Sequence, residues 1–378
     1  MQKGRMVMKA EKKSRRFKTA VLIMALCIAA GSMFAMTGCG SDEEAAPEGE
    51  KAPAYVNPLT GEGMDSEIEA ARPLVVSIDN VGDAIPQSWL SMADMIYEFP
   101  VEGRQTRLQA VYYSEFPEEF GPLGSVRPYF VDLVREYDAI YLAHGWSPDA
   151  KSYLLSGVVP YINGMNSELD FYRSPEKSAP HDSYLKWSEV KSKIDQQGWW
   201  SESVEVDPFE FLGSGEIVPG ERALKVNFAY SSSKCEFTYD GATNTYKRTI
   251  NGKEYIDLET GEQIETSNIL VQKVSSSVMD GKGRLKINMC SGGEAMLFTG
   301  GKMVKGSWSR ADLDSRTVFV DEAGNEFRLS AGTTWVEVAD QSCSITYDNA
   351  GLSEEVIKVL DAAEATALKL VELNITAE

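Results

Sequence analysis

The chain has only two histidines in 378 residues, His144 and His181. Metal centres built from several histidines are therefore excluded, and the five cysteines include no CxxC spacing of the kind that binds zinc or exchanges disulfides. The sequence also lacks the GxSxG, HExxH, P-loop and dinucleotide-binding glycine signatures. We therefore expect neither a metal nor a cofactor.

Basic residues are scarce as well. The chain has 37 Lys and Arg against 57 Asp and Glu, a formal net charge of −20 at pH 7. Eight of the basic residues precede Cys39, where Glu11 is the one acidic residue. Without residues 1–38 the chain keeps 29 basic and 56 acidic residues, a charge of −27. Because phosphate binders need clustered Lys and Arg, we expect no nucleic-acid partner.

The sequence has one long apolar stretch, from Val21 to Ala35, interrupted only by Gly31 and Ser32. No later run reaches the roughly 18 residues that a membrane-spanning helix needs. The basic region precedes this stretch, and small residues lead from it to Cys39. This order predicts a lipoprotein signal peptide over residues 1–38, with Cys39 as the lipidation site and first mature residue. An uncleaved membrane anchor with an incidental cysteine is the alternative.

Both interpretations place the rest of the chain outside the cytoplasm. We expect the protein on the extracytoplasmic face of the cell membrane, with the membrane as a partner through lipid at Cys39. Two acyl chains would anchor it stably, whereas one saturated chain binds only marginally.

Three cysteines remain after the lipidation site: Cys235, Cys290 and Cys343. An odd count allows at most one internal disulfide. Because free cysteine is among the most buried residue types, we interpret all three as small buried residues.

The composition of the remaining chain changes along its length. Residues 39–68 are rich in Glu, Ala, Pro and Gly, which predicts a disordered acidic linker. We expect an α/β domain over 69–217, a mostly β domain over 218–345 and a helical tail over 346–378. The predicted fold class is α+β, with an N-terminal mixed α/β domain, a mostly antiparallel β domain and a C-terminal helix.

Strand-like and helix-like runs are interleaved in the first domain. Ser125 is the predicted cap of a helix that continues to Tyr137, with Pro128 in its first turn. A second amphipathic helix is expected over Ser183–Gln197. The predicted strands are Pro73–Asp79, Met95–Phe99, Leu108–Ser114 and Ile140–Ala143.

In the second domain, short runs rich in β-branched and aromatic residues are separated by turn signals. Asn251-Gly252 and Gly300-Gly301 predict tight hairpins, because both turn positions accept positive φ. After these runs, apolar residues recur at helical spacing over Ser353–Leu373. This helix is expected to pack on the β domain, with a partner helix or an oligomer contact as the alternative. The predicted strands are Leu224–Tyr230, Glu236–Tyr239, Thr245–Ile250, Ile269–Val274, Leu285–Met289, Met296–Thr299, Thr317–Val320 and Thr334–Val338.

Polar residues in the loops of the first domain form the candidate site. Both histidines lie beside Gly or Pro, and ligand-contacting groups of α/β sheets follow strand ends. Several arginines accompany them in an otherwise acidic chain, and arginine binds carboxylates and phosphates with two hydrogen bonds. Structural histidines and loop-ordering ion pairs with Glu98, Glu102 and Asp132 are the simpler alternative. The candidate ligand-binding residues are Glu102, Arg107, Ser125, Arg127, His144, Ser147, Arg173 and His181.

The same segments carry a resemblance to a known family. The first domain contains "RPLVVSIDN", "ADMIYEFPVEGRQTRLQAVYY", "GPLGSVRPYFVDL", "YLAHGWSPDA" and "APHDSY", and the second contains "YDGATNTYKRTINGKEYIDLETGEQIETSNILVQ" and "GTTWVEV". These motifs, over roughly 57–340, resemble the YerB-like lipoproteins (domain of unknown function 3048). The chain departs from the family pattern at Gly124, where the family has Arg, and at Asp182, where it has Asn. The resemblance implies an exported lipoprotein of two domains and brings no established reaction.

We therefore favour an extracytoplasmic lipoprotein without catalytic activity that binds an envelope polymer or a partner protein. The alternative is a hydrolase of cell-wall glycan or peptide. Glu98 and Glu102 would then act as an acid and a base, or His144 would activate Ser147 or Ser125. A purely structural scaffold is the third interpretation.

Overall fold

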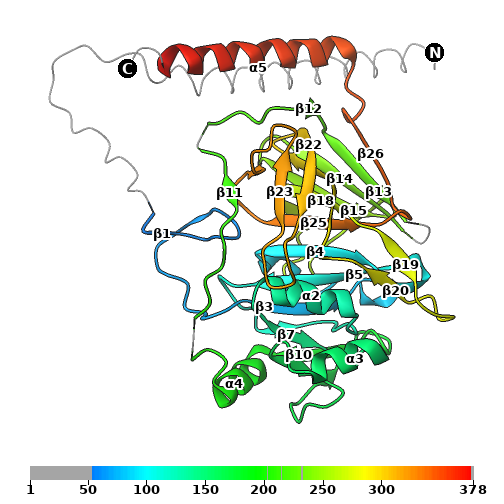
Figure 1. Cartoon of the computed structure of the whole chain (residues 1–378). Helices are drawn as coiled ribbons and strands as arrows, with labels where there is room; N and C mark the ends of the chain where they lie inside the picture. Colours follow the sequence, from blue (N-terminus) through cyan, green and yellow to red (C-terminus); the bar gives the residue numbers. More distant parts are fainter. Residues whose placement is uncertain (1–52, 202, 214, 231–232, 376–378) are drawn as a thin grey trace, which may run out of the picture. The chain divides into compact units, whose positions relative to one another are not determined.

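The computed structural model describes residues 53–201, 203–213, 215–230 and 233–375. Residues 52–350 form one compact unit, and the C-terminal helix α5 (Glu354–Ile375) belongs to a second. The first unit contains many strands, mostly antiparallel, and three α-helices among its described residues (Figure 1). The predicted α+β class, with a mixed first half, a β-rich second half and a C-terminal helix, is confirmed.

An eleven-stranded sheet runs through both halves of the sequence. The two halves of the sequence meet in this sheet where β25 pairs in parallel with β4. On its other side β25 pairs in parallel with β18, which also belongs to the second half. One sheet thus contains strands from both sides of residue 217. The division into two domains at that residue stays a prediction. In spatial order the strands are β12 (Glu221–Arg222), β22 (Lys302–Ser309), β21 (Gly292–Thr299), β18 (Asn268–Lys273), β25 (Thr334–Ala339), β4 (Met95–Pro100), β5 (Thr106–Tyr112), β3 (Leu74–Asp79), β7 (Ile140–Ala143) and β8 (Tyr161–Asn163), with β23 (Val318–Asp321) beside β22.

A second, six-stranded sheet comes from the second half alone. Asn251 and Gly252 form its tightest turn, with φ of 51° and 76°, and Gly300 and Gly301 join β21 to β22 with φ of 55° and 72°. Both predicted hairpins are thereby confirmed. The strands of this sheet are β16 (Lys253–Glu254), β15 (Thr245–Ile250), β14 (Lys234–Asp240), β13 (Lys225–Ala229) and β26 (Ser344–Asp348), with β17 (Glu265–Thr266) beside β15.

The large sheet has an apolar core on each face, because successive side chains of a strand point to opposite sides. In β3, Val75 belongs to one core, which includes Phe130 of helix α2. Val76 belongs to the other core, which includes Phe228 and Phe237 of the second sheet. Covering both faces explains why β3, β4 and β25 are buried along their whole length.

The helices of the first unit differ from the sequence prediction at their N-termini. Helix α2 (Pro128–Glu136) begins after Arg127, so Ser125 is not its cap. The expected helix over 183–197 divides into strand β10 (Ser183–Lys186) and helix α4 (Trp187–Gln197). Ser183 and Tyr184 pair with β9 (Tyr172–Arg173), a partner that local periodicity does not reveal. Helix α3 (Pro148–Leu155) follows β7.

Short elements complete the unit. Residues 53–68, which composition assigned to the linker, form strands β1 (Tyr55–Val56) and β2 (Gly63–Met64). Leu59 is fully buried there, and Asn57 Nδ2 donates to Asp94 Oδ1 at 2.6 Å. Residues 39–52 lie outside the described residues. The remaining elements are β6 (Glu119–Phe120), β11 (Glu210–Phe211), β19 (Ser276–Val278), β20 (Leu285–Ile287) and β24 (Arg328–Leu329), with short 3₁₀ turns at Gly82–Ala84, Leu90–Met92 and Glu102–Arg104.

Helix α5 confirms the helix predicted over 353–373, and Ser353 accepts a hydrogen bond from Val356 N at 3.4 Å at its start. Among the described residues, no helix combines the length and hydrophobicity required to cross a bilayer. Cys235, Cys290 and Cys343 are all free thiols. Only Cys235 is buried, so the interpretation of all three as buried residues was wrong for the other two.

Candidate functional site

Most of the predicted site residues lie at one edge of the large sheet. Strand β3 ends at Asp79 and β7, which is parallel to it, ends before His144. Strand β5 is antiparallel to β3, so Arg107 at its start is the partner of Asp79. The carboxyl ends of parallel strands are where α/β sheets place ligand-contacting groups.

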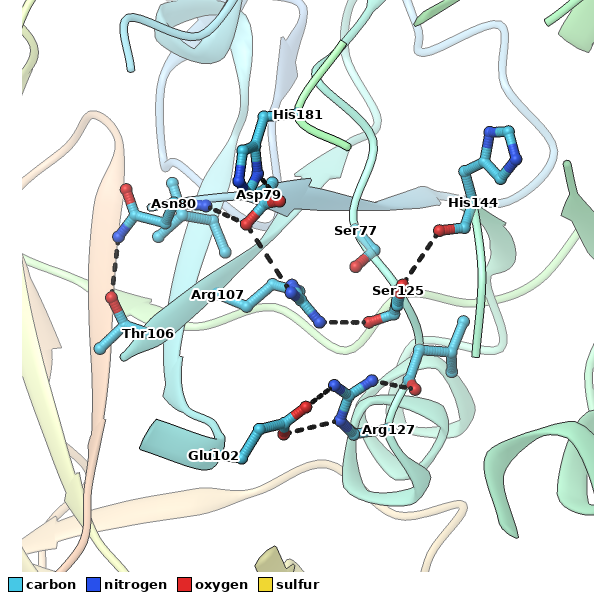
Figure 2. Close-up of polar contacts among 12 residues, drawn as sticks. Ser77, Asp79, Asn80, Glu102, Thr106, Arg107, Ser125, Arg127, His144 and His181 are labelled. Atoms are coloured by element: carbon cyan, nitrogen blue, oxygen red, sulfur yellow. Dashed lines mark hydrogen bonds and ion pairs between the residues drawn. The ribbon is translucent and has the colours of Figure 1, made fainter. Parts of the chain in front are cut away.

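Asp79 is the centre of this edge, although sequence reasoning did not select it. Its side chain is 7% exposed and contacts two of the predicted residues. His181 Nδ1 lies 2.6 Å from Asp79 Oδ2, and Arg107 Nη2 lies 3.7 Å from Asp79 Oδ1 (Figure 2). A buried carboxylate that contacts an imidazole nitrogen fixes the ring orientation. An acidic residue at the end of a buried strand was the available signal.

Arg107 connects β5 to the loop before helix α2. Its Nη1 donates to Ser125 O at 2.9 Å, and Ser125 Oγ donates to His144 O at 3.2 Å. A Cβ on Gly124 would lie 2.8 Å from Arg107 Cδ, so a larger residue here would require the Arg107 side chain to shift. Burial lowers the pKa of Arg107 while Asp79 opposes that effect, and the guanidinium keeps its charge at neutral pH.

Arg127 forms a bidentate pair with Glu102. Arg127 Nε donates to Glu102 Oε2 at 3.0 Å, and Nη2 donates to Glu102 Oε1. Arg127 is 8% exposed, whereas the side chain of Glu102 is 30% exposed. Burial alone would raise the pKa of Glu102, but the hydrogen bonds and charge of Arg127 outweigh it and hold the pKa below its usual value.

We call Asp79, Glu102, Arg107, Ser125, Arg127 and His181 the polar network. The carbonyls of Ser125 and Val126 hold its two halves together, because Arg107 donates to the first and Arg127 Nη1 to the second. Figure 2 shows these side chains around the segment that enters helix α2. Each of its arginines faces a carboxylate, and the ion-pair alternative had named one of these two carboxylates, Glu102.

His144 joins this network only through its main chain. Its ring turns away from Ser125 (Figure 2) and its Nδ1 lies 2.5 Å from Ser183 Oγ. Phe171 contacts the ring edge-on, with centroids 5.2 Å apart. Burial lowers the pKa of His144 below 6.5, and the charge of Arg173 lowers it further.

Two further predicted residues lie outside the polar network. Ser147 Oγ accepts a hydrogen bond from Ala150 N at 3.3 Å and thereby caps helix α3. Arg173 on β9 pairs with Asp182, with Nη1 and Oδ1 2.6 Å apart, and its side chain is 52% exposed. Because Asp182 follows His181, this pair places the exposed cation at the end of β9 beside the loop that carries the imidazole.

Glu98 is unavailable for acid or base catalysis. Its side chain is fully buried, and Oε1 accepts from Asn80 Nδ2 at 3.1 Å and Thr106 Oγ1 at 2.6 Å. Oε2 accepts from Arg248 Nη2 at 2.9 Å. Because both oxygens have protein partners, Glu98 and Glu102 do not form the pair of accessible carboxylates that a glycosidase uses.

The described residues contain no group of three or more His, Cys, Asp or Glu side chains arranged to hold a metal ion. The polar network instead presents both charges and one imidazole. The imidazole is that of His181, whose side chain is 23% exposed. Its Nδ1 contacts Asp79, and its Nε2 has no protein partner within the described residues. The arrangement can bind a polar or charged group at its surface.

Comparisons with known proteins extend over both halves of the chain. Models of a "Protein of unknown function (DUF3048)" match, the N-terminal domain over residues 59–200 and the C-terminal domain over 224–336. The "Putative lipoprotein YerB" of Bacillus subtilis (strain 168) is 32% identical over 320 residues, which is 83% of this chain and 94% of that protein. The crystal structure of the YerB protein from Bacillus subtilis matches with a TM-score of 0.69 at 31% identity, over 77% of this chain and 99% of that one.

Proposed function

The chain belongs to the DUF3048 family, and from this premise we propose that it is a lipid-anchored extracytoplasmic protein that binds an envelope component or a partner protein. Its relative in Bacillus subtilis is named a lipoprotein, which supports a lipoprotein of unknown activity. The lipid site is Cys39, because the basic, apolar and small-residue order leads directly to it. The chain between Cys39 and Pro53 spans at most about 50 Å, which would keep the folded unit close to the membrane.

The observation that carries the binding proposal is the contact between His181 and Asp79. The buried carboxylate holds Nδ1 of an accessible imidazole, so the other nitrogen, Nε2, points to its ligand with a fixed orientation. Arg173, half exposed at the end of β9, adds a cation that pairs with Asp182 through Nη1 and has further N–H groups. When the imidazole carries both protons, Nε2–H and the guanidinium both donate, and together they favour an anionic group, a phosphate or a carboxylate, on the envelope component or partner.

The hydrolase alternative receives less support. Asp79 and His181 have the arrangement of an orienting carboxylate and a base. Within the described residues, however, no hydroxyl or thiol is hydrogen-bonded to His181. The hydroxyls of Ser125 and Ser147 contact main-chain groups instead. A nucleophile is therefore missing from the arrangement that the sequence suggested.

The test measures how much of the mature protein, in detergent, binds to isolated cell envelopes before and after protease treatment of the envelopes. His181→Asn and Arg173→Gln should each weaken binding by about tenfold or more, because a hydrogen bond to a charged group contributes about 1.5–3 kcal/mol. Lys282→Gln, an exposed cation beyond the β19 strand, is the matched control and should bind as wild type. Loss after protease treatment identifies a protein partner, and retention identifies a polymer. Equal binding of all variants would refute the site.

A further inference from the structure

A separate groove of about 940 Å³ lies on the first unit, away from the polar network. It is formed by residues 57–70, by residues 91–94 and 114–116, and by the start of helix α4 with Trp200. None of the polar network residues lines it. The volume is at the upper end of the range for small-molecule sites, which suits several units of an extended chain.

One wall of the groove is aromatic. Phe116 and Trp187 stack with their rings 4.2 Å apart and 5° from parallel, and Trp200 lies 5.8 Å and 5.9 Å from them. All three side chains are half-buried. Lys191 Nζ lies 5.9 Å from the centroid of the Trp200 ring, so this wall already contacts an ammonium group. A cation over an indole face is attracted by the negative potential of the ring.

Five acidic residues are also among the lining residues of the groove. Glu62, Glu67, Glu69 and Glu115 are exposed, and none of them forms an ion pair with a described residue. Asp94 differs, because it accepts hydrogen bonds from Tyr113 N at 2.7 Å and Ser114 Oγ at 2.6 Å. Lys191 is the one lysine or arginine among the lining residues, and its Nζ already pairs with Asp195 Oδ2 at 2.8 Å, so the four glutamates have no cation of their own among the lining residues. Their mutual repulsion would be relieved by a cationic ligand.

We propose that this groove, formed by the four glutamates and the aromatic wall, binds an extended peptide segment that carries lysine or arginine side chains. The peptide cations would pair with the glutamates and contact the indole faces. A neutral glycan would also stack on the rings, but it would leave the negative charge uncompensated. A second copy of this chain is disfavoured, because the chain itself is acidic. The proposal concerns a different site from the polar network and does not depend on it.

The experiment follows tryptophan fluorescence of the mature protein in detergent as pentalysine is added. Wild type should bind pentalysine, with an affinity that falls as salt is raised. Glu67→Gln combined with Glu69→Gln should weaken binding by about tenfold or more. Both residues are exposed, so the variant should fold, and an unchanged thermal unfolding midpoint checks this. Glu322→Gln, an exposed glutamate after strand β23, is the matched control and should leave binding unchanged.

A second variant separates binding from any structural role of the wall. Lys191→Gln removes the resident ammonium group from the Trp200 ring and should tighten pentalysine binding several-fold. A merely structural lysine would give no such gain. Pentaserine and a chitin tetrasaccharide serve as neutral probes. The proposal would be overturned if the saccharide bound more tightly than pentalysine or if pentalysine did not bind. It would also be overturned if the double glutamine variant bound pentalysine as tightly as wild type.

Discussion

Two glutamates on neighbouring strands, Glu98 and Glu337, differ in the partners of their carboxylates. They are paired in the register of β4 and β25, and both are fully buried. Glu98 faces Arg248, whose guanidinium also lies 4.0 Å and 4.5 Å from the ring centroids of Tyr255 and Trp335. Glu337 Oε1 accepts from the hydroxyl of Tyr230, while Oε2 accepts no hydrogen bond from the described residues. Glu98 is therefore the carboxylate that pairs with Arg248, whereas burial favours the protonated form of Glu337.

The pKa of Glu337 explains the direction of its effect on stability. Burial raises this pKa well above 4.5, and the charge of Glu98 raises it further. The folded state therefore holds a proton that the unfolded state releases as pH rises above 4.5. The contribution of Glu337 to the free energy of unfolding is fully present below pH 4.5 and is lost as pH rises toward its raised pKa. A glutamine at this position resembles the protonated carboxyl and carries no such pH dependence.

We predict opposite effects for the two glutamine substitutions. Glu337→Gln should raise the free energy of unfolding at pH 8 and leave it nearly unchanged at pH 4.5. Glu98→Gln should lower it by about 3–5 kcal/mol at pH 7, because Arg248 would remain as a buried charge without its partner. Denaturant unfolding of both variants at the two pH values measures these changes. Equal destabilisation by both would show that Glu337 is ionised and shares the charge of Arg248.

At the scale of elements, β4 and β25 are the seam between the two halves of the sequence. Met95 to Glu98 of β4 pair with Thr334 to Glu337 of β25, and both strands are buried throughout. The ion pair of Glu98 and Arg248 also joins the halves. A fragment that ended at residue 217 would expose a long apolar strand edge, which is a site for aggregation.

We predict that residues 53–217 and 218–350 do not fold separately. Each fragment alone should lack dispersed amide resonances and a cooperative thermal transition, and refolding the two together should restore both. Two cooperative transitions from the separate fragments would show that the seam is a contact between independent domains.

Local chemistry determined which elements were predictable. The turns at Asn251-Gly252 and Gly300-Gly301 were predictable because positive φ is a property of those residues themselves. The start of α4 was not predictable, because Ser183 and Tyr184 pair with strand β9 instead of joining the helix. That pairing is not visible in a helical periodicity of three to four residues. For the same reason the sequence indicated Arg107 and His181 but not Asp79, which becomes their common partner only through strand register and loop closure.

At the scale of the whole molecule, the distribution of charge agrees with the expected location at the extracytoplasmic face of the membrane. The basic residues concentrate before Cys39, and the remaining chain is strongly acidic. Attraction to anionic headgroups would therefore not hold the folded unit at a membrane. We therefore expect membrane attachment of the mature protein to depend on lipid at Cys39.

We predict that Cys39→Ala abolishes lipid attachment. Cells fed labelled palmitate should label the wild-type protein and not the variant, and the variant should keep residues 1–38 and migrate as a larger precursor. Cys27→Ala lies within the apolar stretch and is the matched control, which should label as wild type because it is not the processed cysteine. High salt should not release the wild-type protein from membranes, since acyl chains hold it through apolar burial rather than charge. Palmitate on the Cys39→Ala variant, or none on the wild type, would contradict the lipid anchor.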